Sequence, residues 1–159
     1  MKFMLKQKFW SWGDDFVIRD EEGRECYQVD GAVFSFGDSL TIRDMAGKVV
    51  ATIEQALLSW GPTYEIRRPG HAETRVRKEV FTFFTCEYEV DGPGDEDYEA
   101  KGDFLDHEYE LFQRGRLAAR VTKEWFTLSD SYGIEIADSE DPVLLLATAV
   151  VIDLVCHGD

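Results

Sequence analysis

The chain has 159 residues, with 32 acidic and 17 basic side chains and a formal net charge of −15 at pH 7. A hydrophobic fraction of 44% excludes a disordered tail, and this length fits one domain with a substantial core. The acidity disfavours binding of nucleic acid, because that affinity depends on neutralising phosphates with Lys and Arg. We therefore expect a single acidic domain over residues 1–159.

Apolar residues alternate with polar ones through most of the chain, between segments that are typical of turns. The alternating sets are Phe16/Ile18, Tyr27/Val29, Leu40/Ile42, Val49/Ala51/Ile53, Tyr64/Ile66, Phe81/Phe83, Leu117/Ala119/Val121 and Ile134/Ile136. A period of two predicts antiparallel β-strands with one face buried.

A short motif occurs twice. The segments IRDEEGR (18–24) and IRDMAGK (42–48) share the pattern Ile-Arg-Asp-x-x-Gly-basic. We interpret each as strand, turn and strand, in which Asp binds its own backbone and Gly supplies a positive φ. A looser copy at 109–121 lacks the Asp and is one residue shorter at the turn. Residues 47–66 also align without gaps on 115–134, so the domain is expected to consist of two similar β halves with the acidic stretch 86–110 between them.

The last segment differs in character. Ser139, Glu140, Asp141 and Pro142 are typical of a helix start, and from Val143 to Ile152 Thr148 is the one polar residue. A helix that is apolar on every side must be buried on every side. We therefore predict a closed antiparallel barrel over about residues 3–138, which encloses a central helix over about residues 141–156.

These features together resemble the LURP-one-related family. The resemblance rests on the repeated IRD-x-x-G hairpin, on Val50, Ile53 and Gln55 after the second turn, on Asp130-Ser131-Tyr132-x-Ile134, and on the apolar helix that ends in Ile152-Asp153. It covers the chain from about Phe3 to Val155. This family is similar to the tubby C-terminal domain and to phospholipid scramblases, which implies a barrel of about twelve strands around a hydrophobic helix.

The resemblance implies less about function. Most members of the family have no assigned activity, whereas tubby domains bind phosphoinositide head groups through basic surface residues. No residue of this chain matches those positions individually. The calcium segment of scramblases has no counterpart, because DSEDPV (138–143) lacks the spaced Asp and Asn ligands of such a loop.

The basic residues of RRPGHAETRVRK (67–78) are the best candidates for contact with an anionic ligand. They are Arg67, Arg68, Arg75, Arg77 and Lys78, and we expect them on the two arms of a hairpin. Arg suits phosphate and carboxylate equally well, so the alternative is that these side chains pair with neighbouring Asp and Glu.

Other polar residues favour structural roles. His71, His107 and His157 are isolated in the sequence, and His107 is expected at the surface, so we predict no metal site and no cofactor. Asp153 is expected at the barrel mouth, bonded to a backbone N–H or a surface Arg. Trp10, Trp12, Trp60 and Trp125 are assigned to the core. No nucleophile, base and oxyanion donor can be named together.

We therefore expect a non-catalytic binding or scaffold domain, with an unknown protein or a small anionic ligand as its partner. The alternative is weak peripheral binding of anionic phospholipid head groups by a basic patch, and a hydrolase-like enzyme is a distant third. Three scattered cysteines, the absence of a signal-peptide pattern and an apolar run of 13 residues (143–155), too short to cross a bilayer, favour a soluble cytoplasmic protein.

Overall fold

A computed structural model describes residues 1–6, 16–30, 39–56, 63–80, 86–92, 97–125 and 131–157. Within these ranges the chain forms twelve strands followed by one helix. The elements are β1 (Lys2–Lys6), β2 (Phe16–Asp20), β3 (Glu25–Asp30), β4 (Ser39–Asp44), β5 (Val49–Gln55), β6 (Thr63–Arg67), β7 (Thr74–Val80), β8 (Cys86–Asp91), β9 (Tyr98–Asp103), β10 (Glu108–Gln113), β11 (Arg116–Thr122), β12 (Ser131–Ile136) and α1 (Pro142–His157).

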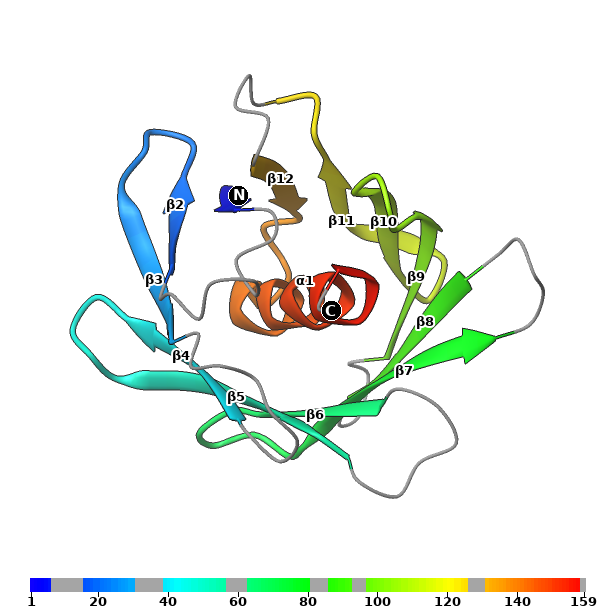
Figure 1. The fold of residues 1–159 in the computed structure, drawn as a ribbon, viewed down its shortest axis with the longest axis horizontal. Helices are drawn as coiled ribbons and strands as arrows, with labels where there is room; N and C mark the ends of the chain where they lie inside the picture. The colour runs from blue at the N-terminus through cyan, green and yellow to red at the C-terminus, as the bar shows by residue number, and fades with distance from the viewer. Residues whose placement is uncertain are drawn as a thin grey trace.

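The strands close into a barrel. Each strand pairs antiparallel with its neighbours in the sequence, and β1 pairs with both β2 and β12. Figure 1 shows the resulting ring of strands with α1 at its centre. The predicted fold class is therefore confirmed.

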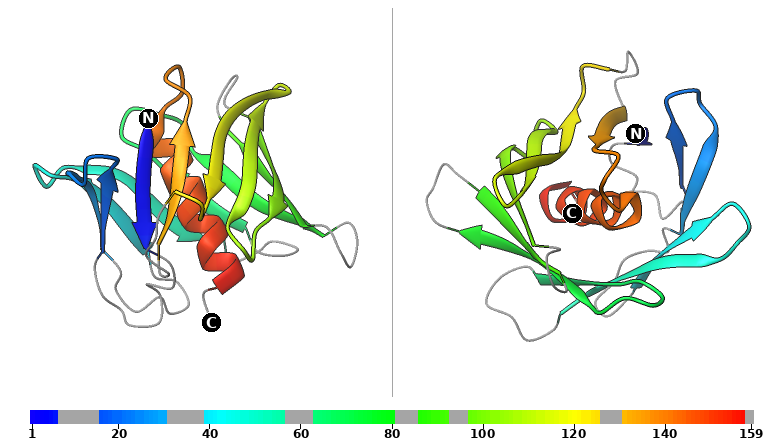
Figure 2. Two further views of the ribbon diagram at one scale, coloured as in Figure 1. Left: turned by 90° about the horizontal axis from the view of Figure 1, so that it is seen from above. Right: turned by 180° about the vertical axis from the view of Figure 1, so that it is seen from behind.

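Helix α1 is enclosed by the barrel, as the two further views in Figure 2 show. Every residue from Leu144 to Leu154 is at most 6% exposed. The buried hydroxyl of Thr148 donates to the carbonyl oxygen of Leu144 at 2.8 Å, which satisfies it within the helix. Burial of a large aliphatic side chain contributes about 1.5–3 kcal/mol, so this helix supplies a large share of the core. Among the described residues, no helix has the length and apolarity needed to cross a membrane.

The two repeated turns adopt the same structure. In each, the Asp carboxylate (Asp20 or Asp44) accepts hydrogen bonds from the backbone N–H groups two and four residues later, at 3.0 and 2.9 Å. Gly23 and Gly47 have φ values of 80° and 85°. The predicted role of the motif as a turn is confirmed. The shorter third copy is a two-residue turn in which Arg114 and Gly115 both have positive φ.

The alternation prediction holds for most strands and is wrong for Leu117. Inward residues such as Ile18, Ile42, Ile53 and Ile134 are at most 1% exposed, whereas Leu117 is 51% exposed. The register between β10 and β11 shifts after Leu111, so that Ala118 and Ala119 are both buried and Leu117 lies outside. A bulge of this kind inserts one residue and reverses the inward and outward positions beyond it.

Several predictions fall outside the described residues. Trp10, Trp12, Trp60, Phe81, Phe83 and the tip of the acidic loop at 93–96 belong to this part of the chain. Trp125 is described and is half-buried, with the Lys2 ammonium 5.0 Å from its ring centroid.

Candidate functional site

The predicted basic residues lie on the β6–β7 hairpin. Arg67 ends β6 and Arg68 follows it, whereas Arg75, Arg77 and Lys78 belong to β7. All except Arg68 lie at the outside of the barrel or are half-buried there.

Three of the arginines contact carboxylates of the hairpin itself or of the strands beside it. Arg67 lies 2.7 Å from Glu54, and 3.1 Å from both Glu65 and Glu73. The hydrogen bond to Glu73 and then the charge of Glu54 raise the pKa of this guanidinium. Arg75 contacts Glu65 and Glu73 in the same way, at 3.8 and 3.4 Å. The charge of these two arginines is therefore compensated by carboxylates of the hairpin and of β5.

Arg77 and Lys78 lie further along β7 and differ in their charge partners. The Arg77 guanidinium lies 3.0 Å from both Glu89 and Asp91 of β8. Lys78 makes no ion pair with any described residue. The structure thus surrounds the predicted hairpin with acidic partners, the arrangement named above as the alternative to a ligand site.

Arg68 has a different environment. It is 4% exposed and forms a close ion pair with Asp141, the residue before α1. The other carboxylate oxygen of Asp141 accepts a hydrogen bond from the backbone N–H of Val143 at 3.0 Å. Asp141 therefore caps the helix, with Pro142 at the first helical position, and Arg68 holds that cap against the barrel.

A small hollow lies beside this ion pair. Its cavity volume is about 130 Å³, and its lining residues are Lys48, Val49, Val50, Arg68, Pro69, His71, Asp141 and Val143. The charged or titratable groups around this space are therefore two cationic side chains, one imidazole and one carboxylate. Lys48 and His71 are exposed, whereas Arg68 is buried.

The two repeated turns differ at the basic residue that lines this hollow. In the first turn the Arg24 guanidinium pairs with its own Asp20 at 2.8 Å. At the equivalent position of the second turn, the Lys48 ammonium makes no ion pair with a described residue and lines the hollow with Arg68. The site therefore holds a cationic group beyond those needed to balance Asp141. Sequence reasoning identified Arg68 but missed Lys48 and His71, although the repeat could have marked Lys48.

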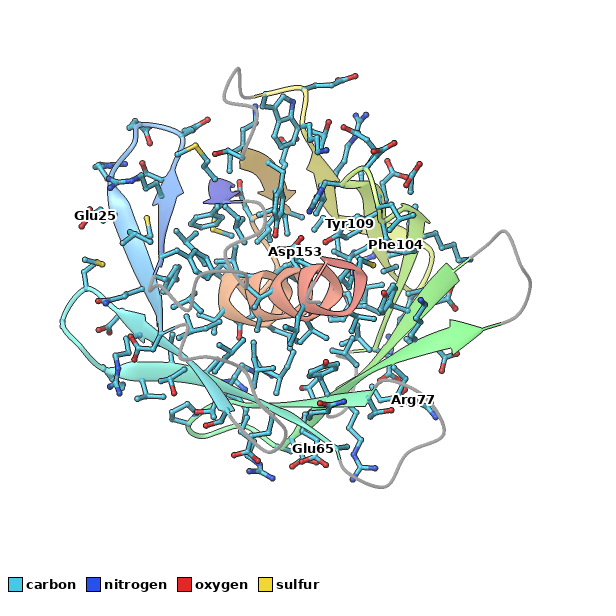
Figure 3. All side chains as sticks on the ribbon, viewed as in Figure 1. Glu25, Glu65, Arg77, Phe104, Tyr109 and Asp153 are labelled. Carbon is cyan, nitrogen blue, oxygen red and sulfur yellow. The ribbon has the colours of Figure 1, made fainter. Side chains whose placement is uncertain are left out.

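A second polar cluster lies at the other half of α1. Asp153 is 1% exposed, and its carboxylate lies 2.6 Å from Nε2 of His107, which is also 1% exposed. The His107 ring stacks on Tyr132, with 4.3 Å between the ring centroids. In Figure 3 Asp153 lies on the side of α1 that faces Tyr109 and Phe104. The expectation of a surface His107 is therefore wrong, and the carboxylate of Asp153 has an imidazole as a partner.

This cluster shifts the acidity of two tyrosines. Burial, followed by the charge of Asp153, raises the pKa of Tyr109 and of Tyr132 well above the ordinary value. The Tyr132 hydroxyl is buried and has no hydrogen-bond partner among the described residues. All four side chains are at most 3% exposed, and the contact between His107 and Asp153 ties α1 to the turn before β10.

The comparisons with known proteins agree with the fold. The model of the LURP-one-related family matches residues 1–153. The chain is 36% identical to "Uncharacterized protein YxjI" of Bacillus subtilis (strain 168) over 159 residues, which are 100% of this chain and 96% of that protein. The solved structure of an Arabidopsis thaliana protein, AT5G01750, is similar with a TM-score of 0.67 and 16% identity, over 96% of this chain and 90% of that one. The chain therefore belongs to the LURP-one-related family.

Proposed function

We propose that this chain is a non-catalytic binding domain that receives a small anionic group in the hollow beside the start of α1. The observation that carries the proposal is the convergence of Lys48 and Arg68 on one small space, where Asp141 balances one of the two charges. A carboxylate or a phosphate of a soluble metabolite or of a cytoplasmic protein is the expected ligand chemistry, because both match the Lys and Arg donors.

The positions of the lining groups support this proposal. Arg68 is fixed by its ion pair with Asp141, so its guanidinium loses little additional freedom when a ligand binds. Lys48 and His71 come from the two turns on either side of the hollow and supply further donors. Since the β6–β7 arginines are already paired with carboxylates, the hollow is a better candidate than Arg67, Arg75 and Arg77.

Phospholipid head groups are the second candidate, because they carry the same anionic chemistry. They require the hollow to be reachable from a membrane surface, and the net charge of −15 opposes approach to an anionic bilayer. A small soluble anion carries far less charge than a membrane surface, so the same net charge opposes its approach less.

The test is a titration of the ¹⁵N-labelled protein with inorganic phosphate and with succinate, followed by amide chemical shifts. We expect saturable shifts around the hollow that Lys48→Ala abolishes. Arg24→Ala is the matched control, since it removes a basic side chain from the equivalent turn and is expected to leave binding unchanged. Lys48 donates to Asp44 through its backbone N–H, so the truncation leaves the turn intact. Shifts without saturation, or equal losses in both variants, would refute the proposal.

Two further arms separate the candidates. Binding to phosphoinositide vesicles without binding to the free inositol phosphate would favour the second candidate, binding of phospholipid head groups at a membrane. Turnover of a generic phosphoester or carboxylic ester by the purified chain would contradict the non-catalytic assignment.

A further inference from the structure

The outer face of β7 to β11 carries a row of side chains that the strand register brings together. Arg77 is opposite Glu89, Glu89 is opposite Glu99, Glu99 is opposite Phe112, and Phe112 is opposite Leu117. The row therefore passes from charged residues to apolar ones over neighbouring strands. Leu117 is 51% exposed, and Phe112 is half-buried.

A groove lies over the middle of this row, on the side of the barrel where β8 and β9 are seen in Figure 1. Its cavity volume is about 360 Å³, and its lining residues are Glu89, Val90, Asp91, Asp97, Tyr98, Glu99, Phe112, Arg114 and Gly115. Tyr98 is 4% exposed, and its hydroxyl donates to Glu140 at 2.5 Å, so this part of the groove floor is fixed to the segment before α1.

The charges along this row differ from those of the next row along the strands. There, side chains of opposite sign face each other across four strand pairs: Lys2, Glu135, Arg120, Glu110 and Lys101. In the groove, by contrast, Glu89 and Glu99 are directly opposite each other. Like charges at such positions destabilise a sheet, so a cation placed between them is favoured.

The carboxylates of the groove are engaged through exposed contacts. Glu89 and Asp91 share Arg77, and Glu99 lies 3.1 Å from Lys101. Exposed ion pairs of this kind contribute little to stability, so the cation of a partner can replace them at small cost.

We propose that this groove, together with the exposed Leu117 on the strand beside it, docks an extended segment of a partner protein in which Lys or Arg is followed by bulky apolar residues. The cationic side chain lies between Glu89 and Glu99, and the apolar side chains pack on Phe112 and Leu117. Strands are about 4.8 Å apart, so the distance from β8 to β11 is roughly 14 Å, which about four extended residues span. The net charge of −15 steers a basic segment toward the domain. This inference rests on other residues than the anion hollow and stands independently of it.

The test uses a fluorescein-labelled peptide, Ser-Lys-Ser-Leu-Ser-Leu-Ser, which places Lys and both Leu on one side of an extended chain. Fluorescence anisotropy measures its affinity for the full chain, and amide shifts locate it. We expect saturable binding with shifts at Val90, Tyr98 and Phe112. Replacing the peptide's Lys by Glu, or both Leu by Ser, is expected to weaken binding about tenfold, as is typical for the loss of one central contact.

Protein variants separate docking from attraction by net charge alone. Glu99→Lys and Leu117→Ser are each expected to weaken binding about tenfold, with far-ultraviolet circular dichroism confirming the fold. Glu25→Lys is the matched control, because it changes the net charge equally but lies on β3, away from Arg77 in Figure 3. An equal loss in Glu25→Lys, no loss in Leu117→Ser, or no saturable binding by the unaltered chain would overturn the proposal.

Discussion

The buried contact between His107 and Asp153 allows a sharp test of what fixes α1 inside the barrel. The two groups are 2.6 Å apart, their side chains are at most 2% exposed, and 46 residues separate them in the sequence. The two partners differ in one respect. An imidazole can remain neutral when its partner is lost, whereas a carboxylate in the same place carries its charge or must take up a proton.

We therefore expect substitutions of the two residues to lower the free energy of unfolding by unequal amounts. His107→Asn removes the imidazole that the buried carboxylate contacts, which is expected to cost about 3–5 kcal/mol in free energy of unfolding. Asn also tolerates the left-handed backbone of this position, where φ is 54°, so the loss does not arise from backbone strain. Asp153→Asn keeps the shape and a hydrogen-bonding oxygen, and is expected to cost about 1 kcal/mol.

Urea denaturation of the two variants and of the double variant measures these values. Because a domain of this size unfolds with about 5–15 kcal/mol, the larger loss is easily resolved. We expect the double variant to be more stable than His107→Asn alone, since it no longer buries a charge. Asp106→Asn, an exposed acid in the same turn, is the control and should stay within about 0.5 kcal/mol of the parent. Equal losses in the two single variants would refute the assignment of Asp153 as the buried charge.

Three further predictions concern the core and one turn. Because the folded-state pKa of Tyr109 and Tyr132 is raised, their phenols stay protonated in the folded chain, whereas the phenols of the unfolded chain ionise above about pH 10. The free energy of unfolding should therefore keep its full value below that pH and fall above it by ~1.4 kcal/mol per pH unit for each phenol. Urea unfolding between pH 9 and 11.5 measures this, and a flat profile would contradict it. Tyr132→Phe removes a buried hydroxyl that has no hydrogen-bond partner among the described residues, so thermal unfolding at pH 7 should show no loss of stability, and the alkaline slope should decrease by the share of one phenol. Gly102→Ala should lower the free energy of unfolding far more than Gly47→Ala, because a Cβ at Gly102 would lie 2.6 Å from the carbonyl oxygen of Glu108. At Gly47 a Cβ meets no atom within 4 Å, so the expected cost is about 1 kcal/mol for the positive φ. Similar losses of stability in urea would show that the close contact at Gly102 is easily relieved.

The periodicity of apolar residues was sufficient to predict the architecture, because the pattern of the strands and the pattern of the helix each need a cover that the other provides. Strands with one apolar face need something to cover that face, and a helix that is apolar all round needs cover on every side. A barrel around the helix satisfies both. The exception, Leu117, depends on a bulge that places Ala118 and Ala119 both inside, and two adjacent alanines carry no signal for a bulge.

The site could not be predicted to the same extent, because it depends on register and on distant contacts. Whether Arg77 is free or paired depends on its position opposite Glu89, which follows from the pairing of β7 with β8. That Asp153 needs a partner could be inferred from its apolar surroundings, but the partner is placed by a turn in which His107 has a positive φ. His107 itself lies between two acids in DHE, a pattern that is typical of a surface turn.

The start of α1 connects the two surfaces for which binding is proposed. Arg68 of the hollow pairs with Asp141, and Tyr98 of the groove donates to Glu140, the preceding residue. The two contacts come from different sides of the barrel and converge on one turn of chain. Since most of α1 is held by apolar packing, which has no preferred direction, these polar contacts, the His107–Asp153 pair and the contact of the Tyr88 hydroxyl with Sγ of Cys156 fix its rotation and depth. The helix that fills the lumen therefore also sets the position of both outer surfaces, and this explains why buried polar residues occur at both ends of an otherwise apolar core.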